Sequence, residues 1–291
     1  MPLQDKIESG EFVALGELEP PKGADFSLFL SNANLVKGRV DALVVPEMAN
    51  AVMKAGSLGG CMFLQNQGLE TVLQVCCRDR NRLALQADLL AAAAMGIRNV
   101  MVVGGEDINT GDHHQARDVY DLDVLQLLEA IRELQAGRDM AGIGLRGAPR
   151  FFVGTAINAG ATGGALNIEL EELKQKIDLG VKFVVTTPVF DLFRFENLLK
   201  RMGTENVAVI PTVLLLKSAG MARYIDRNVR HIAIPPETIR AIQKAPDKVR
   251  HCIKLAGETV AALKDMGLAG VVISTIGWED KIPQILDQAK V

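Results

Sequence analysis

Residues 71–104 read TVLQVCCRDRNRLALQADLLAAAAMGIRNVMVVG and contain two apolar runs with a longer segment between them. The runs Thr71–Cys77 and Asn99–Gly104 are nearly continuous in apolar residues, which is typical of strands that are covered on both faces. The segment Arg82–Met95 is apolar almost all round, so it predicts a deeply packed helix that ends at Gly96. The order indicates a strand, a helix and a second strand of one α/β sheet.

The same alternation continues to both ends of the chain. Stripes of apolar residues at helical spacing predict helices over Leu122–Leu134 and Ile168–Leu179, each followed by a glycine. The further strand candidates are Phe12–Glu17, Val40–Val45, Arg150–Thr155, Val181–Thr187, Asn206–Pro211 and Gly270–Thr275.

Eight strands alternating with helices, without a low-complexity linker, predict an eight-fold β/α (TIM) barrel that forms a single domain over residues 1–291. A doubly wound open sheet is the alternative, and it would need a glycine-rich fingerprint after the first strand. The chain there reads Glu17-Leu18-Glu19-Pro20-Pro21-Lys22-Gly23, so the barrel is favoured.

Composition excludes several classes of protein. With 32 basic and 35 acidic residues the net charge is −3, which argues against nucleic acid as a partner. The start of the chain has no apolar segment behind basic residues, and the most apolar run, Leu89 to Ile97, is too short to span a membrane. The four cysteines include no CxxC pair. We expect a soluble cytoplasmic protein that does not bind a membrane.

In a β/α barrel, the chemistry lies at the carboxyl ends of the strands. Glu17 ends the first strand and Glu106 follows the fourth, so these carboxylates could face one another across a ligand of several rings. Partial desolvation would raise the pKa of Glu17 and suit it to general acid catalysis. The alternative is that Glu17 or Glu19 pairs with Lys22 on the rim.

Glycines precede Glu106 in the sequence Gly104-Gly105-Glu106-Asp107. A backbone without a Cβ can approach a flat ligand closely, and the neighbouring carboxylates can accept hydrogen bonds from ring N–H groups. A plain turn with exposed acids is the alternative interpretation.

Other segments give weaker signals. His113 and His114 suggest a metal, but adjacent histidines point apart, and His231 and His251 lie in unrelated segments, so we expect no metal site. Cys76 and Cys77 are better suited to buried apolar positions than to a redox role. The run 78–82 could bind an anion at a helix start or form a solvated charge run, and the run 160–164 resembles a phosphate loop only weakly.

Taken together, several ordered motifs resemble the methylenetetrahydrofolate reductase family, and most closely the short forms of anaerobic one-carbon pathways. The resemblance covers essentially the whole chain. The motifs are Gly16-Glu17-Leu18-Glu19-Pro20-Pro21-Lys22-Gly23, Cys77-Arg78-Asp79-Arg80-Asn81-Arg82, Gly96-Ile97-Arg98-Asn99-Val100, Gly111-Asp112-His113, Val119-Tyr120-Asp121-Leu122-Asp123, Pro188-Val189-Phe190-Asp191, Leu216-Lys217-Ser218-Ala219-Gly220-Met221-Ala222-Arg223-Tyr224 and Ile276-Gly277-Trp278-Glu279.

The resemblance implies a barrel that holds a flavin against a folate and reduces 5,10-methylenetetrahydrofolate to 5-methyltetrahydrofolate. It gives Glu17 the role of helping to protonate N10, and Glu106 that of stabilising the cationic iminium ion. It implies flavin contacts for Gln74, Gly105, Tyr120, Gly154, Ala156, Glu169 and Lys176, with Lys176 suited to the phosphate. Phe190 belongs to the segment that stacks on the folate. The cofactor is FAD, or alternatively FMN.

Three positions depart from the family pattern. Glu106 stands where an aspartate is usual, Thr187 where a folate-binding glutamine is common, and Leu215 where a proline is usual. The extra methylene of Glu106 shifts its carboxylate, and the threonine cannot make the two-point contact of an amide.

The electron donor stays open between NAD(P)H and an iron–sulfur partner subunit, because the chain has no cysteine cluster of its own. An oligomer or hetero-complex is expected. Two other functions remain: a folate-binding barrel that transfers a methyl group to a corrinoid partner, and a non-catalytic subunit of an electron-transfer complex.

Overall fold

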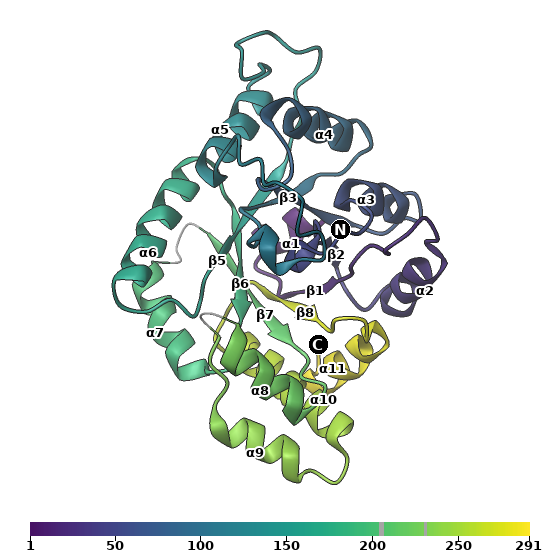
Figure 1. Cartoon of the computed structure of the whole chain (residues 1–291), viewed down its shortest axis with the longest axis vertical. Coiled ribbons are helices and arrows are strands. Elements are labelled where there is room, and N and C mark those ends of the chain that lie inside the picture. The colour runs from purple at the N-terminus through teal and green to yellow at the C-terminus, as the bar shows by residue number, and fades with distance from the viewer. Residues whose placement is uncertain (204–206, 230–231) are drawn as a thin grey trace.

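The computed structural model describes residues 1–203, 207–229 and 232–291. The described residues form eight parallel strands that close into a barrel in the order β1 to β8, with helices packed around its outside (Figure 1). The strands are β1 Val13–Glu17, β2 Ala42–Val45, β3 Thr71–Cys76, β4 Asn99–Val103, β5 Phe152–Ile157, β6 Phe183–Pro188, β7 Ala208–Leu214 and β8 Gly270–Ser274.

All eight predicted strands are present, and the predicted β/α barrel is confirmed. The open-sheet alternative is wrong, because β8 pairs with β1 in register from Val13–Gly270 to Gly16–Ile273 and leaves no sheet edge. The predicted strand over residues 206–211 begins at Asn206, which lies outside the described residues, and β7 continues to Leu214.

Helices follow the strands and cover the outer face of the barrel. They are α1 Leu3–Glu8, α2 Ser27–Val36, α3 Ser57–Gln65, α4 Arg82–Ala94, α5 Val124–Gln135, α6 Gly163–Asp178, α7 Leu192–Met202, α8 Ala219–Asn228, α9 Pro236–Lys244, α10 Lys248–Asp265 and α11 Ile282–Ala289, with short 3₁₀ turns η1 Ala49–Ala51, η2 Ile108–Thr110 and η4 Glu279–Lys281. The Asn81 side chain caps α4 by accepting N–H groups of Leu83 and Ala84, so this helix begins where the sequence predicts.

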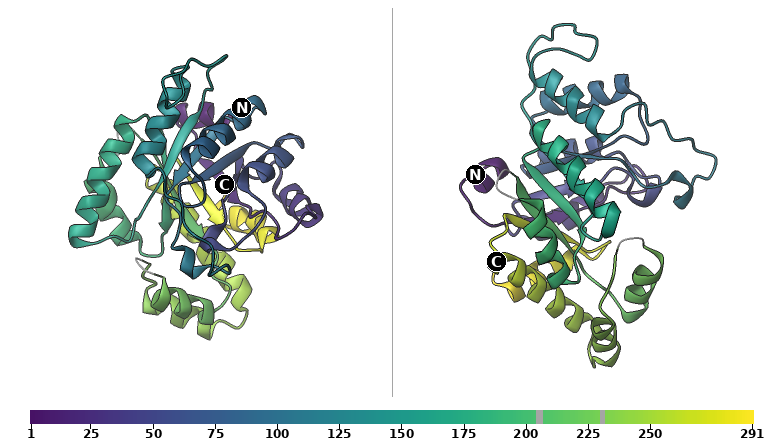
Figure 2. Two further views of the ribbon diagram at one scale, coloured as in Figure 1. Left: turned by 45° about the horizontal axis from the view of Figure 1, so that its top comes forward. Right: turned by 90° about the vertical axis from the view of Figure 1, so that its left-hand side faces the viewer.

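The barrel interior is a separate apolar layer. Alternate residues of the strands point inward and form one cluster, among them Val13, Val44 and Val272. The short helix α1 closes the amino-terminal end of the barrel with Leu3, which is fully buried in the same cluster. In the right-hand view of Figure 2 the N-terminus and α1 lie at one side of the barrel. The opposite end, at which the strands have their carboxyl ends, is the end where a β/α barrel places its chemistry, and we call this end the mouth.

No described helix has the length and apolar character needed to cross a bilayer.

Candidate functional site

Glu17 is the last residue of β1 and its side chain is partly buried at the mouth. The hydroxyl of Ser274, at the end of β8, donates to Oε1 of Glu17 over 2.6 Å. Burial raises the pKa of the Glu17 carboxyl, and the negative charges of Glu106 and Glu279 act in the same direction. The Ser274 hydrogen bond and the Lys54 ammonium oppose them, but the pKa remains raised. Such a carboxyl can hold a proton closer to neutral pH than an exposed one.

The alternative pairing of Glu17 or Glu19 with Lys22 is wrong. Lys22 forms its ion pair with Asp112, and Glu19 pairs with Lys54. Both ion pairs link different loops of the mouth. Asp112 also accepts the N–H of Met53, so it contacts the loop after β2 as well.

Glu106 lies in the loop after β4, and its side chain is 53% exposed. The guanidinium of Arg78 donates from Nη1 to the Glu106 carboxylate over 3.4 Å and to its backbone carbonyl over 3.3 Å. The predicted acidic side chain therefore lies on the rim of the mouth and contacts the buried guanidinium of Arg78. The negative charge of Glu106 acts to raise the pKa of Glu17.

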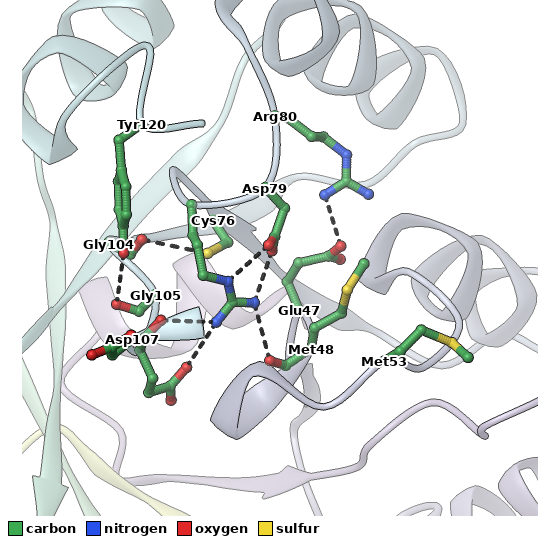
Figure 3. Close-up of polar contacts among 12 residues, drawn as sticks. Glu47, Met48, Met53, Cys76, Asp79, Arg80, Gly104, Gly105, Asp107 and Tyr120 are labelled. Atoms are coloured by element: carbon green, nitrogen blue, oxygen red, sulfur yellow. Dashed lines mark hydrogen bonds and ion pairs between the residues drawn. The ribbon is translucent and has the colours of Figure 1, made fainter. Parts of the chain in front are cut away.

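Arg78 is itself the largest fully buried side chain, at 1% exposure. Nε and Nη2 form a two-point ion pair with Asp79, at 2.7 and 2.8 Å, and Nη2 also donates to the Met48 carbonyl over 3.2 Å. The raised pKa of this guanidinium follows first from its hydrogen bond to Asp79. Figure 3 shows how Met48, Asp79 and the loop of Gly104 to Asp107 converge here.

The other arginines of the run 78–82 are also paired. Arg80 contacts Glu47 over 2.7 Å and Asp88 over 3.0 Å, and Arg82 contacts Asp121 over 2.9 Å. The interpretation as a solvated charge run holds only for Asn81 and Arg82, which are exposed, because Arg78 and Arg80 are held in ion pairs further inside. The anion site stays a prediction. Two of the partners, Glu47 and Asp121, are distant in the sequence, so no local pattern reveals them.

Gly105 presents bare backbone at the mouth. Its φ is +94°, and a Cβ there would lie 2.6 Å from Sγ of Cys76 and 2.9 Å from Cβ of Arg78. Tyr120 approaches from the end of the same loop, with its hydroxyl donating to the Gly105 carbonyl over 3.4 Å. Glu106 and Asp107 are exposed, as the plain-turn interpretation predicts, but packing and backbone conformation both require glycine at position 105.

We expect Gly105→Ala to lower the free energy of unfolding by about 2 kcal/mol or more, because strain at positive φ adds to a steric clash. Gly104→Ala is the matched control. Its Cβ would meet nothing closer than Val124 Cγ2 at 3.8 Å, so its loss should be much smaller. Urea unfolding followed by circular dichroism measures both, and equal losses would contradict the prediction.

Gln74 lies in β3, and its amide oxygen accepts the N–H of Glu47 over 2.9 Å. That contact fixes the orientation of the side-chain amide. Glu47 is buried and has a structural role. Its carboxylate accepts the N–H of Ser57 over 2.6 Å. It also accepts a hydrogen bond from Nη1 of Arg80 (Figure 3).

The predicted residues of β5 and β6 have packing roles that the sequence did not show. A Cβ on Gly154 would lie 2.2 Å from the ring of Phe183, so this glycine makes room for the aromatic stack of Phe152 and Phe183 inside the barrel. Ala156 lies half-buried beside the interior cluster. Thr187 accepts the N–H of Ala159 over 3.1 Å, and Phe190 borders a cavity of about 70 Å³ with Leu214.

Glu169 and Lys176 lie on α6. Glu169 accepts the N–H of Asn158 over 3.0 Å and so holds the loop after β5. Lys176 lies in the last turn, where it is buried and pairs with Glu172 over 3.6 Å. Because α6 runs back from the mouth, the structure does not bring Lys176 to the strand ends.

Metal ligands and cysteines give no second centre in the described part of the chain. Across residues 1–203, 207–229 and 232–291, no three His, Cys, Asp or Glu side chains cluster as a metal site would require. His113 contacts Asp112 over 2.8 Å, and His231 lies outside the described residues. Cys76 and Cys77 are buried as predicted, and burial raises their thiol pKa values to about 11 and about 12.

Sequence reasoning missed Ser274 and the buried role of Arg78. The signal for Ser274 was available, since it is the last residue but one of the predicted strand over residues 270–275, and alternation places it on the same side as Val272. For Arg78 the adjacent Asp79 was visible in the sequence, but the contacts to Met48 and Glu106 come from other loops and had no local signal.

The comparisons with known proteins agree with this architecture. The chain matches the methylenetetrahydrofolate reductase family over residues 2–290. It is 22% identical to methylenetetrahydrofolate reductase 2 of Schizosaccharomyces pombe over 99% of this chain, which spans 43% of the length of that relative. The activity, substrates and partners of the longer protein therefore do not transfer directly.

Solved structures share the fold at low identity. An uncharacterised protein from Clostridium thermocellum that binds two copies of 5-methyl-5,6,7,8-tetrahydrofolic acid superposes with a TM-score of 0.71 at 13% identity, over 99% of both chains. A 2,3-dimethylmalate lyase superposes with a TM-score of 0.54 at 10% identity, covering 93% of this chain and 79% of the lyase. On the match over residues 2–290, the chain belongs to the methylenetetrahydrofolate reductase family.

Proposed function

We propose that this protein reduces 5,10-methylenetetrahydrofolate to 5-methyltetrahydrofolate with a bound flavin. The observation that carries the proposal is Glu17, a partly buried carboxyl with a raised pKa at the mouth of the barrel. Family membership supports the substrate class. A carboxyl with a raised pKa keeps its proton to a higher pH than an exposed one, and a proton donor is the group needed to open the five-membered ring of the substrate.

The residues around the mouth suit a flat cofactor. Gly105 offers backbone without a side chain, Gln74 offers an oriented amide, and Ala156 is small. Tyr120, Gly154 and Glu169 complete the proposed flavin set by supporting the loops and strands beneath it. FAD is the proposed cofactor, with FMN as the alternative. When bound, the reduced flavin supplies the hydride.

The side chains of the protein handle protons and charge. Glu17 donates a proton to N10 as the ring of the substrate opens to an iminium ion, and the carboxylate of Glu106 stabilises that positive charge. Thr187 and Phe190 contact the folate in this proposal. The electron donor is either NAD(P)H or an iron–sulfur partner subunit.

The test begins with the purified protein. Flavin absorbance that bleaches with dithionite and recovers when methylenetetrahydrofolate is added supports the proposal. A colourless protein that still binds tetrahydrofolate would point to methyl transfer to a corrinoid partner, and one that binds neither would point to a non-catalytic subunit. Either of these results would overturn the proposed reaction.

Lys176 is left out of the proposed flavin set, because it lies buried in the last turn of α6, away from the mouth, and pairs with Glu172. We expect Lys176→Ala to bind as much flavin per protein as the wild type. Lys174→Ala is the control, because Lys174 is exposed on the same helix and pairs with Glu171. A loss of flavin in Lys176→Ala that Lys174→Ala does not show, measured by absorbance after denaturation, would return Lys176 to the cofactor site.

A further inference from the structure

Ser274 and Glu17 meet where the last strand of the barrel joins the first. Parallel pairing of β1 and β8 sets Gly16 beside Ile273, so the next residues of the two strands are Glu17 and Ser274. Ser274 is 5% exposed, and its hydroxyl donates to Glu17 over 2.6 Å. This is a short hydrogen bond to a carboxylate from a donor fixed on a strand.

The charged groups around Glu17 are engaged elsewhere. Lys54, from the loop after β2, pairs with Glu19. Glu279, from the loop after β8, accepts the N–H of Gly277 over 2.9 Å and the amide of Asn32 over 2.8 Å. Glu106, from the loop after β4, contacts Arg78. Among the described residues, Ser274 is thus the group that touches the Glu17 carboxyl directly.

A hydroxyl can serve both states of a carboxyl. It donates to the ionised carboxylate, and after rotation it can accept from the protonated acid. A lysine ammonium or an amide N–H can only donate, so it could not accept the O–H of the protonated acid. A neutral partner of this kind holds the side chain in place while the proton leaves and returns.

We propose that Ser274 is a positioning residue for Glu17, fixing one carboxyl oxygen in both protonation states so that the other faces the ligand. The inference rests on the proposed function, since it takes Glu17 as the proton donor. Its physical basis is the 2.6 Å contact between two strand ends.

The test is an NMR titration of ¹³C-labelled glutamate side chains in the protein without folate, with the Glu17 signal assigned by its loss in Glu17→Gln. In Ser274→Ala the midpoint of Glu17 is expected to rise by about one pH unit, because the hydroxyl bonds the ionised carboxylate more strongly than the neutral acid and the variant loses both bonds. Ser274→Thr keeps the hydroxyl and is expected to retain the wild-type midpoint.

Thr155→Val is the matched control, because Thr155 is a buried barrel hydroxyl that bonds the Val102 carbonyl and not Glu17. Its midpoint should equal that of the wild type. An unchanged midpoint in Ser274→Ala, or an equal rise in Thr155→Val, would overturn the proposal. If Ser274→Ala does not fold, Ser274→Cys replaces it, and its weaker donor should still raise the midpoint above that of the wild type.

The titration separates this inference from the proposed reaction. A protein that reduces no folate but shows the expected shift disproves the reaction and keeps the contact. A protein that reduces folate while Ser274→Ala titrates like the wild type keeps the reaction and removes Ser274.

Discussion

Glu17→Gln is expected to retain its flavin and to lose folate reduction by about 10²- to 10⁴-fold, the usual contribution of a general acid. The substitution removes the proton but keeps the size of the side chain and an oxygen that can accept from Ser274. Reduction of the flavin by its electron donor should stay near the wild-type rate, because that half-reaction needs no proton from Glu17. Stopped-flow absorbance measures the two halves separately.

The same substitution should not cost stability. Because burial raises the pKa of Glu17, the folded protein holds this proton more tightly than the unfolded chain, so the free energy of unfolding falls as the pH rises above the ordinary glutamate value. At pH 8 the ionised carboxylate therefore lowers the free energy of unfolding, and the neutral glutamine side chain does not. We expect Glu17→Gln to be at least as stable as the wild type at pH 8, with the difference narrowing toward pH 4.5.

Glu19→Gln is the control for charge near the mouth, since Glu19 lies two residues further along and pairs with Lys54. It should keep most of the folate reduction. Wild-type folate turnover in Glu17→Gln with a full complement of flavin would exclude Glu17 from the mechanism.

Arg78→Met is expected to lower the free energy of unfolding by about 3–5 kcal/mol, the range found when one member of a buried ion pair is removed. The guanidinium is fully buried and donates to the Asp79 carboxylate, to Glu106 and to the Met48 carbonyl. Methionine fills much of the volume but leaves Asp79 charged and the two carbonyls without this donor. Urea unfolding at pH 7 gives the measurement.

Arg82→Met is the matched comparison, because Arg82 pairs with Asp121 near the surface, with side chains 48% and 31% exposed. Exposed pairs contribute up to about 1 kcal/mol, so this variant should remain close to the wild type. Equal losses of unfolding free energy in the two variants would contradict the prediction that the buried ion pair of Arg78 contributes more to stability than the exposed pair of Arg82.

The architecture could be predicted from the sequence because each strand shows as a local run of apolar residues. Apolar runs placed every strand, and the helix predicted over Arg82–Met95 matches α4 to within one residue. The sequence did not predict α8, α9 and α10 between β7 and β8. α8 and α9 are short, and prolines precede α9 and α10.

The site was predictable only in part. Glu17 could be placed from its strand, because the end of a strand fixes which way a side chain points, and Gly105 from the glycine pair that follows the fourth strand. The partners of Arg78 come from loops after β2, β3 and β4, so no local pattern relates them. Thr187 and Gly154 were assigned to ligands, but their contacts to Ala159 and Phe183 depend on packing between neighbouring strands.

The hydrogen bond between Ser274 and Glu17 joins residues 257 positions apart, at opposite ends of the chain. During synthesis, β1 leaves the ribosome long before its partner β8 exists, so its edge stays unpaired until the last strand arrives. The acid at the mouth therefore acquires its partner only in a finished barrel. If Glu17 is the proton donor that we propose, a chain that lacks β8 has no positioned donor, so the proposed activity would begin only when the barrel is complete.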